Sequence, residues 1–432
     1  MTPRIRIPLA ALIALLAVAC AQNTVEAPRP APEPQPVPPA WPQPAPPEPE
    51  PAAADELSFE AWLRGYRMEA LAAGIPASVV ERELSGLTPN PSVVKLDGKQ
   101  PEFSRPVGEY VQGVTSEARV GQGAQYRDSL SYLGAIEQRY GVPREVVLAV
   151  WALESSYGKV QGDMDVVRSL ATLAWDGRRR DWAEDELTAA LRIIARGEAT
   201  RSQLKGSWAG AMGQTQFLPS VYLKTAVDGD GDGKRDIWGS THDALASTAN
   251  YLAQAGWLSG QGWAWEVTLP PGFDYSLSEG PKEPPSWWQA KGVRRADGAS
   301  WSGAEANAPM QLILPAGADG PAFLVGPNHF AIRAYNNSTS YALGVGVLAD
   351  RLAGRPAIAK RWPDEVPLSL YARQQAQRDL AKVGFDPGPA DGIIGANTRA
   401  ALRDWQKARG LPADGYLSPA VIRRLSAEAA GR

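Results

Sequence analysis

The stretch that most constrains the fold is GVPREVVLAVWALESSYG, from Gly141 to Gly158. Gly141 and Pro143 interrupt the preceding segment, and a proline suits the first turn of a new helix. That helix is expected to end near Glu154, because serines, a tyrosine and a glycine follow it. The residues that share the face of the glutamate at helical spacing are Val147, Val150 and Trp151. We therefore predict a core helix that carries Glu154 on its apolar side.

A glutamate in that position has two interpretations. Desolvation by apolar neighbours raises the pKa of a carboxyl group, so that it stays protonated near neutral pH. Such an acid can donate a proton to the leaving oxygen of a glycosidic bond. The alternative is a partly buried, hydrogen-bonded glutamate at a helix end that has no chemical role.

The composition limits the kinds of side chain that can act in catalysis or metal binding. Its 432 residues are 44% hydrophobic, which is enough for two or three domains with their own cores. The formal net charge of −3 gives no argument for nucleic acid as a partner. A single cysteine excludes a disulfide within the chain, and two histidines, His242 and His329, disfavour zinc sites and histidine-based triads. We expect carboxylates, amides and hydroxyls to act instead, with aromatic rings as surfaces for sugars.

The first residues are predicted to be a targeting signal rather than part of a folded domain. Residues 1–20 contain Arg4, Arg6 and then an apolar run of signal-peptide length. The run ends in LAVAC, which resembles a bacterial lipobox and implies lipid attachment to Cys20, whereas Ala21 points to the outer membrane. An ordinary secretory signal is the alternative. Residues 21–55 are rich in Pro, Ala and Glu and are predicted to be a semi-rigid spacer.

Further polar motifs follow the glutamate. The segment from Lys205 to Ser220, KGSWAGAMGQTQFLPS, combines glycines with neutral donors and acceptors, which suits a substrate with hydroxyl and amide groups. The segment AYNNSTSYALGVGVL carries Tyr335, Asn336 and Tyr341 before an apolar helix. Either segment alone could equally be an ordinary loop between helices.

Together these motifs resemble the MltB-type lytic transglycosylases of bacterial cell walls. The resemblance implies a mainly α, lysozyme-like catalytic domain over residues 56–360, with no organic cofactor. It assigns Glu154 as acid and base, and Ser207 as the residue that orients an N-acetyl group. The other residues that it places on the glycan are Gln216, Tyr335, Asn336, Tyr341, Tyr110 and Trp182. The flank ESSYG departs from the family, where threonine, arginine and tryptophan are common after the glutamate.

The same resemblance implies the reaction. The family cleaves the MurNAc-β-1,4-GlcNAc bond of peptidoglycan without water and leaves 1,6-anhydro-MurNAc ends. Enzymes that use two carboxylates need a second Asp or Glu across the bond, and neither companion motif contains one. A hydrolytic muramidase and a non-catalytic wall-binding scaffold remain the alternatives.

An acidic loop, DGDGDGKRDIW, follows the second motif. Its oxygen donors alternate as in a calcium-binding EF-hand loop, and Gly233 stands where that loop turns sharply. The predicted ligands are Asp228, Asp230, Asp232, the Lys234 carbonyl and Asp236, with Asp243 closing the loop as in related transglycosylases. We expect one structural Ca2+; the alternatives are a turn without metal, and a sodium or weak calcium site.

Two segments complete the chain. Residues 257–322 are rich in Gly, Pro and Trp and are predicted to form a small β-containing insertion, in which Trp287 and Trp288 belong to a glycan groove or to the core. Residues 364–430 resemble the three-helix peptidoglycan-binding domain, with helices at 370–383 and 399–409 and a short third helix. We expect a periplasmic monomer, anchored through Cys20 to the outer membrane of a Gram-negative bacterium. Its expected partners are peptidoglycan strands and complexes of wall synthesis or hydrolysis.

Overall fold

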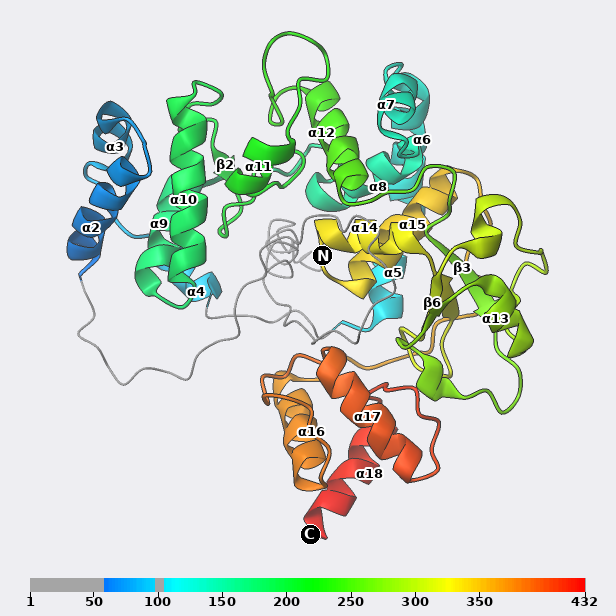
Figure 1. Cartoon of the computed structure of the whole chain (residues 1–432). Coiled ribbons are helices and arrows are strands. Elements are labelled where there is room, and N and C mark those ends of the chain that lie inside the picture. The colour runs from blue at the N-terminus through cyan, green and yellow to red at the C-terminus, as the bar shows by residue number, and fades with distance from the viewer. Residues whose placement is uncertain (1–57, 98–104, 432) are drawn as a thin grey trace, which may run out of the picture. The chain divides into compact units, whose positions relative to one another are not determined.

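The computed structural model describes residues 58–97 and 105–431, so the predicted signal peptide, Cys20 and the spacer lie outside the described residues. Within the described chain the contacts divide into two compact units. One unit contains 58–97, Gly123–Gly256 and Ala334–Asn337, and the other contains 105–122, Trp257–Arg333 and 338–431. Most of the elements are helices, which confirms the predicted fold class (Figure 1). None of the helices in the described ranges has the length and apolar character needed to cross a membrane.

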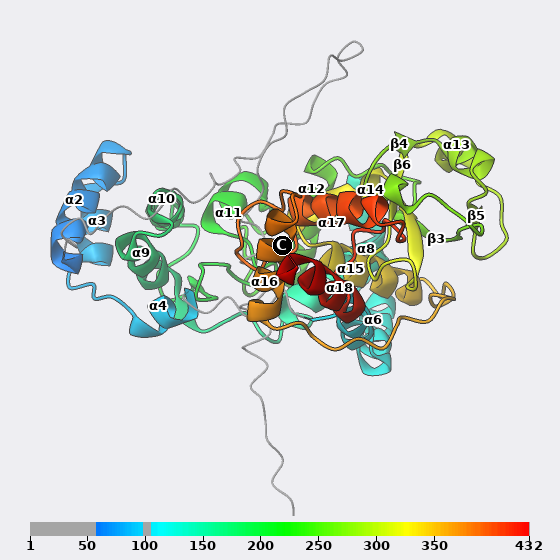
Figure 2. The same cartoon turned by 90° about the horizontal axis from the view of Figure 1, so that it is seen from below.

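The first unit begins with helices that surround a central pair. α9 (Val166–Asp176) and α10 (Arg180–Ala195) pack along each other. The helices beside this pair are α2 (Phe59–Ala72), α3 (Ala77–Leu84) and α4 (Pro91–Asp97) (Figure 2). α2 buries Trp62 and Tyr66 at the spacing of an amphipathic helix, and the Trp62 indole donates to Glu184 Oε1 at 2.8 Å.

The remaining helices of this unit include α8, which carries Glu154. They are α7 (Leu133–Tyr140), α8 (Arg144–Ser155), α11 (Pro219–Thr225), α12 (Thr241–Gln254) and the later part of α6 (Glu117–Ser129). α6 ends at Ser129 and α7 begins at Leu133, so a turn separates them. Tyr126 packs on the rings of Trp151 and Tyr157, and α7 packs on α12 and α8.

The predicted β-containing insertion is a five-stranded antiparallel sheet in the second unit, with strand order β4-β6-β7-β3-β5. The strands are β3 (Ala264–Thr268), β4 (Lys282–Glu283), β5 (Arg294–Arg295), β6 (Met310–Ile313) and β7 (Ala322–Val325). The connections contain η2 (Tyr275–Leu277), α13 (Pro285–Ala290) and η3 (Gly303–Asn307). Trp288 is fully buried and its indole donates to the Met310 carbonyl at 2.9 Å, so this tryptophan belongs to the core.

Other helices of the second unit pack closely. α5 (Val107–Val114) lies against α15 (Thr339–Leu352), and α14 (Pro327–Tyr335) precedes α15 in the chain. A Cβ at Gly346 would lie 2.2 Å from the Trp263 ring, so this contact requires a glycine.

The C-terminal segment forms the predicted bundle of three helices, seen in orange to red in Figure 1. They are α16 (Leu370–Lys382), α17 (Ala396–Ala408) and α18 (Pro419–Ala430), and the third is longer than expected. Leu380, Leu402, Trp405 and Leu425 are fully buried between them.

One carboxylate ties this bundle to the segment that follows η2. Glu279 accepts from Arg399 Nε at 2.9 Å and from Arg403 Nη1 at 3.0 Å, and its side chain is one-quarter exposed. Desolvation alone would raise the pKa of Glu279, but the two guanidinium groups outweigh it and hold the pKa below the usual value of 4.5. The folded state therefore favours the charged form of this side chain.

The first prediction concerns the pH dependence of stability. A carboxyl whose pKa is lower in the folded chain stabilises above its ordinary value and loses this contribution as the pH falls through the folded pKa. Glu279→Gln should melt at a lower temperature at pH 7, with a cost of about 1–3 kcal/mol for losing charged hydrogen bonds. The difference from wild type should shrink below pH 4.5. Thermal melts of the full chain at both pH values measure this.

Asp404→Asn is the matched control, because Asp404 is exposed on the same helix as Arg399 and Arg403. This control should melt like wild type at both pH values. A gap between Glu279→Gln and wild type that stays constant down to pH 3 would contradict the assignment.

Candidate active site

Glu154 lies in the last turn of α8 and is 4% exposed. Every residue from Val146 to Ser155 is buried, so the helix is enclosed on all sides rather than along one stripe. This confirms the predicted burial of the carboxyl group. Pro143 is the N-cap residue, one position before the first turn where it was expected.

The chain leaves α8 through an unusual turn. Ser156 and Tyr157 both have left-handed backbones, with φ of 50° and 58°, which non-glycine residues rarely adopt. Ser155 Oγ donates to the Gln214 carbonyl at 2.7 Å and accepts from the Gly158 N–H at 3.0 Å. The Tyr157 ring packs edge-on against Trp151, with 5.3 Å between ring centroids. The turn after Glu154 is therefore held by side chains.

The second motif folds back on itself. Its first residues form β2 (Lys205–Gly206), which pairs with β1 (Met164–Asp165). Ser207 Oγ accepts from the Ala211 N–H at 3.1 Å, and the Ser207 N–H donates to the Ala211 carbonyl at 2.8 Å. A Cβ at Gly206 would lie 2.0 Å from that same carbonyl. This glycine permits the chain to approach itself, whereas the sequence suggested an approach to a ligand.

Gln216 is held in the same loop by a left-handed backbone with φ of 51°. Its Nε2 donates to the carbonyls of Gln161 at 3.0 Å and Gly213 at 2.9 Å. Its Oε1 is buried and accepts no hydrogen bond from the protein. An acceptor fixed in this way is suited to an incoming hydroxyl or amide N–H.

The third motif contributes to the same unit. Tyr335 is 8% exposed and its hydroxyl donates to the Thr215 carbonyl at 2.6 Å, between Gln214 and Gln216. The Tyr335 ring packs on Tyr251, with 4.8 Å between ring centroids. Asn336 is 2% exposed. The first unit thus contains Glu154, Ser207, Gln216, Tyr335 and Asn336, linked by hydrogen bonds through Ser155, Gln214 and Thr215.

The other predicted glycan residues are placed differently. Trp182 lies on α10 in the first unit, and the Arg179 guanidinium lies 4.9 Å from the centroid of its ring. Tyr110 on α5 and Tyr341 at the start of α15 belong to the second unit, where Tyr341 is fully buried.

The sequence did not reveal two roles within the second motif. Gln214 and Ser220 were expected to offer polar groups to a substrate, but both bind the protein. Ser220 donates to Glu186 through Oγ at 2.6 Å and through its N–H at 2.9 Å. Burial raises the pKa of the Glu186 carboxyl, and the bonds from Ser220 partly offset that rise. Glu186 lies 34 residues away, so no local pattern could have paired the two.

The acidic loop is preformed by its own backbone. Asp228, Asp230 and Asp232 each offer a carboxylate oxygen, and these oxygens lie within 4.8 Å of one another. Asp228 accepts from the N–H groups of Gly231 and Gly233 at 2.6 and 2.8 Å. Gly233 has φ of 88°, which agrees with the sharp turn expected there. Hard oxygen donors in this arrangement fit Ca2+.

Asp243 braces this loop from α12. It is fully buried, and its oxygens accept from the backbone N–H groups of Gly229 at 2.8 Å, Asp230 at 3.3 Å and Asp236 at 2.7 Å. Asp236 in turn accepts from the Trp238 and Gly239 N–H groups at 3.0 and 2.8 Å. Asp228 accepts three such bonds as well, so these contacts do not set Asp243 apart from the other predicted ligands.

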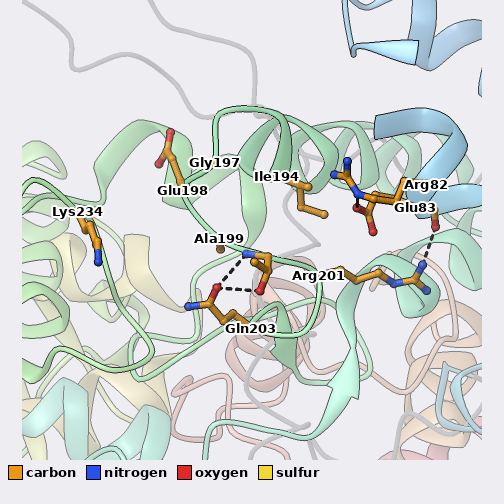
Figure 3. Close-up of a pocket in the computed structure, with 10 residues that line it drawn as sticks. Arg82, Glu83, Ile194, Gly197, Glu198, Ala199, Arg201, Gln203 and Lys234 are labelled. Atoms are coloured by element: carbon orange, nitrogen blue, oxygen red, sulfur yellow. Dashed lines mark hydrogen bonds and ion pairs between the residues drawn. The ribbon is translucent and has the colours of Figure 1, made fainter. Parts of the chain in front are cut away.

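A cavity of about 420 Å³ lies elsewhere in the first unit (Figure 3). Its lining mixes both charge signs, and the polar groups bind each other. Arg201 donates to the Glu83 carbonyl at 2.6 Å, and Gln203 Oε1 accepts from the Thr200 N–H at 3.0 Å. Glu154 and its companions are not among the lining residues, so this cavity is separate from the candidate active site.

Comparison with known proteins agrees with this geometry. The family model of the transglycosylase SLT domain matches residues 58–350, and that of a putative peptidoglycan binding domain matches residues 370–425. The membrane-bound lytic murein transglycosylase B of Escherichia coli K12 is 32% identical over 247 residues, which cover 53% of this chain. The match spans 61% of that relative, which is less than two thirds of its length.

Solved structures of related proteins match a larger part of this chain. SltB3 from Pseudomonas aeruginosa, in complex with NAG-anhNAM-pentapeptide, is 50% identical with a TM-score of 0.82; the match covers 85% of this chain and 99% of that chain. The Escherichia coli transglycosylase Slt35, in complex with calcium, is 30% identical with a TM-score of 0.57. That match covers 67% of this chain and 92% of the other.

Proposed function

Because the chain belongs to the transglycosylase SLT domain family, we propose that it is a lytic transglycosylase of peptidoglycan. It cleaves the MurNAc-β-1,4-GlcNAc bond without water and leaves 1,6-anhydro-MurNAc ends. The observation that carries this proposal is the buried Glu154 carboxyl, joined through Ser155 and Gln214 to the motif of Ser207 and Gln216. The anhydro sugar bound to SltB3 in its solved structure supports the product.

A single carboxyl group performs both proton transfers. Protonated Glu154 donates to the leaving glycosidic oxygen, while the substrate's own 2-acetamido group stabilises positive charge at C1. The glutamate, now charged, accepts the proton of the C6 hydroxyl as that oxygen attacks C1. This sequence needs no second carboxylate, and the segments of Ser207–Ser220 and 335–341 contain no Asp or Glu.

The neutral groups around Glu154 have separate roles in this proposal. Ser207 orients the N-acetyl group, Gln216 accepts from the glycan through its buried Oε1, and Tyr335 with Asn336 completes the sugar contacts. Trp182, in the same unit, contacts a more distant sugar, whereas Tyr341 is fully buried and is not proposed as a sugar contact. Tyr110 stays a prediction of the family resemblance. The C-terminal module binds peptidoglycan and keeps the enzyme on its polymeric substrate.

The second prediction tests the catalytic acid. Glu154→Gln keeps the shape of the side chain but removes the proton donor, so turnover of purified sacculi should fall by about 10²- to 10⁴-fold with folding intact. Glu145→Gln, in the first turn of the same helix, is the matched control and should retain full turnover. Wild-type turnover in Glu154→Gln would sink the assignment.

Mass spectrometry of the wild-type products separates the alternatives. Anhydromuropeptides without incorporated solvent oxygen are expected. Reducing-end MurNAc as the sole product would show a hydrolytic muramidase, and unchanged sacculi would show a wall-binding scaffold.

We further propose that the acidic loop binds one structural Ca2+. The proposed ligands are Asp228, Asp230, Asp232, Asp236, the Lys234 carbonyl and Asp243, which also braces the loop through the Asp236 N–H. Bound calcium would offset the repulsion between the clustered carboxylates. The calcium complex of the related Slt35 supports this choice of ion.

The third prediction concerns this ion. Calcium that binds only the folded chain stabilises it by about 2.7 kcal/mol at 100 times the dissociation constant, so the melting temperature should rise during a titration. Asp228→Asn should abolish the rise, whereas Asp163→Asn, at an exposed position outside the loop, should leave it unchanged. A wild-type melting temperature that does not respond to calcium, at constant ionic strength, would contradict the site.

The last part of the proposal is location. A lipid on Cys20 anchors the protein to the outer membrane, facing the periplasm, where it joins complexes of wall synthesis or hydrolysis as a monomer. The name of the Escherichia coli relative as membrane-bound supports an anchor.

The fourth prediction tests the anchor. Cys20→Ser should move the full-length protein from the outer-membrane fraction to the soluble periplasmic fraction, because no acyl chain can be attached. The released protein should digest purified sacculi at the wild-type rate. Retention of Cys20→Ser in the membrane fraction after a high-salt wash would exclude the lipid anchor.

A further inference from the structure

Gln214 is a buried residue whose four polar groups are all engaged by the protein. It is 4% exposed. On one side it binds α8: Trp151 Nε1 donates to its Oε1 at 2.9 Å, and Ser155 Oγ donates to its backbone carbonyl at 2.7 Å. These two partners stand three residues before Glu154 and one residue after it. The turn of helix that carries the carboxyl group is thus bound from both ends by one residue.

The other side of Gln214 binds the segment that follows the acidic loop. Its backbone N–H donates to the Ile237 carbonyl at 2.9 Å, and its Nε2 donates to the Trp238 carbonyl at 3.2 Å. Gln161 also donates to the Trp238 carbonyl, at 3.1 Å. Gln214 therefore lies between the turn of Glu154 and a segment that is itself fixed by Asp236.

The turn needs such support. The last carbonyls of a helix have no partner in the helix itself. Left-handed backbones at Ser156 and Tyr157 cost on the order of 1–3 kcal/mol each, and they persist only where the surroundings impose them. A Cβ at Gly158 would lie 2.6 Å from Gln214 Oε1, so the turn is packed tightly against this amide.

We propose that Gln214 is a positioning residue, which holds the Glu154 turn at the geometry required for proton transfer. The inference rests on the proposed function, because it assigns Glu154 the catalytic role. Gln214 itself donates nothing to the glycan, since its amide is used within the protein. Its contribution is to the orientation of the acid and not to substrate binding.

Orientation and binding differ in the kinetic constants that they change. Displacing a reacting group by about 1 Å can cost 10²-fold in rate. Gln214→Met removes the side-chain bonds to Trp151, Trp238 and Thr241 at nearly constant volume, so kcat should fall by about 10- to 100-fold while KM stays within about twofold. Gln203→Met, at a glutamine whose side chain binds Thr200 in its own loop, is the matched control and should keep the wild-type kcat.

A double-mutant cycle tests whether Gln214 affects kcat through its hydrogen bond to Trp151. Trp151→Phe removes the indole N–H that binds Gln214 together with part of a buried ring, and it should lower kcat less than Gln214→Met does. Added to Gln214→Met, the same change should cost less than it does alone, because the bond is already lost. Independent, additive losses would overturn the proposed route through this bond.

Amide hydrogen exchange gives a readout without substrate. In Gln214→Met, the amides of Ser156, Tyr157 and Gly158 should exchange about tenfold faster or more, while those of α10 exchange as in wild type. If Gln214→Met does not fold, Trp151→Phe carries the same measurement with its smaller expected change. Unchanged exchange at Ser156–Gly158 together with wild-type kcat would overturn the proposal. If the wild type makes no anhydro products, the proposed function fails while the exchange result still stands.

Discussion

The structure of the first unit depends on placing a carboxyl group at the end of a helix that is buried from Val146 onward. Burying an ionisable group without polar partners is costly, and the surrounding chain must meet that cost. α8 is apolar from Val146 to Leu153, and polar groups follow at its last turn. Ser155, Gln214 and the neighbouring carbonyls form a short layer of amides and hydroxyls inside an otherwise apolar core. This layer allows Glu154 to be both shielded from water and held in place.

The loop that carries Ser207 and Gln216 also supplies neutral polar groups close to the buried carboxyl group. Its glycines let the chain approach protein atoms closely: a Cβ at Gly210 would lie 2.8 Å from Leu170 Cδ2, and one at Gly213 would lie 2.8 Å from the Ile237 carbonyl. Such packing brings Ser207 and Gln216 onto the same loop as Gln214 without introducing a second charge. Neutral donors and acceptors match a substrate rich in hydroxyl and acetamido groups, and they leave the proton chemistry to one residue.

Sequence periodicity was a good guide where neighbours in the chain determine the structure. The spacing of Val147, Val150 and Trp151 predicted a buried α8, and the family resemblance of residues 364–430 implied the C-terminal bundle. Periodicity carries no information about contacts between residues that are distant in the chain. It could not pair Gln214 with Trp151, which lies 63 residues away, or Ser220 with Glu186. These pairings depend on tertiary contacts that leave no periodic trace.

The flank after Glu154 shows how this chain can depart from its relatives and keep the same turn. The family resemblance leads one to expect threonine directly after the glutamate, and a threonine hydroxyl can make the bond that Ser155 makes to the Gln214 carbonyl. The change at that position therefore preserves the chemistry. At the next positions, serine and tyrosine replace arginine and tryptophan, and both residues have left-handed backbones. The Tyr157 ring fills the space against Trp151 and Tyr126, so an aromatic residue is retained where packing fixes the turn. Ser155 and Tyr157 are both buried, so most of this departure lies within the packing of the turn that follows Glu154.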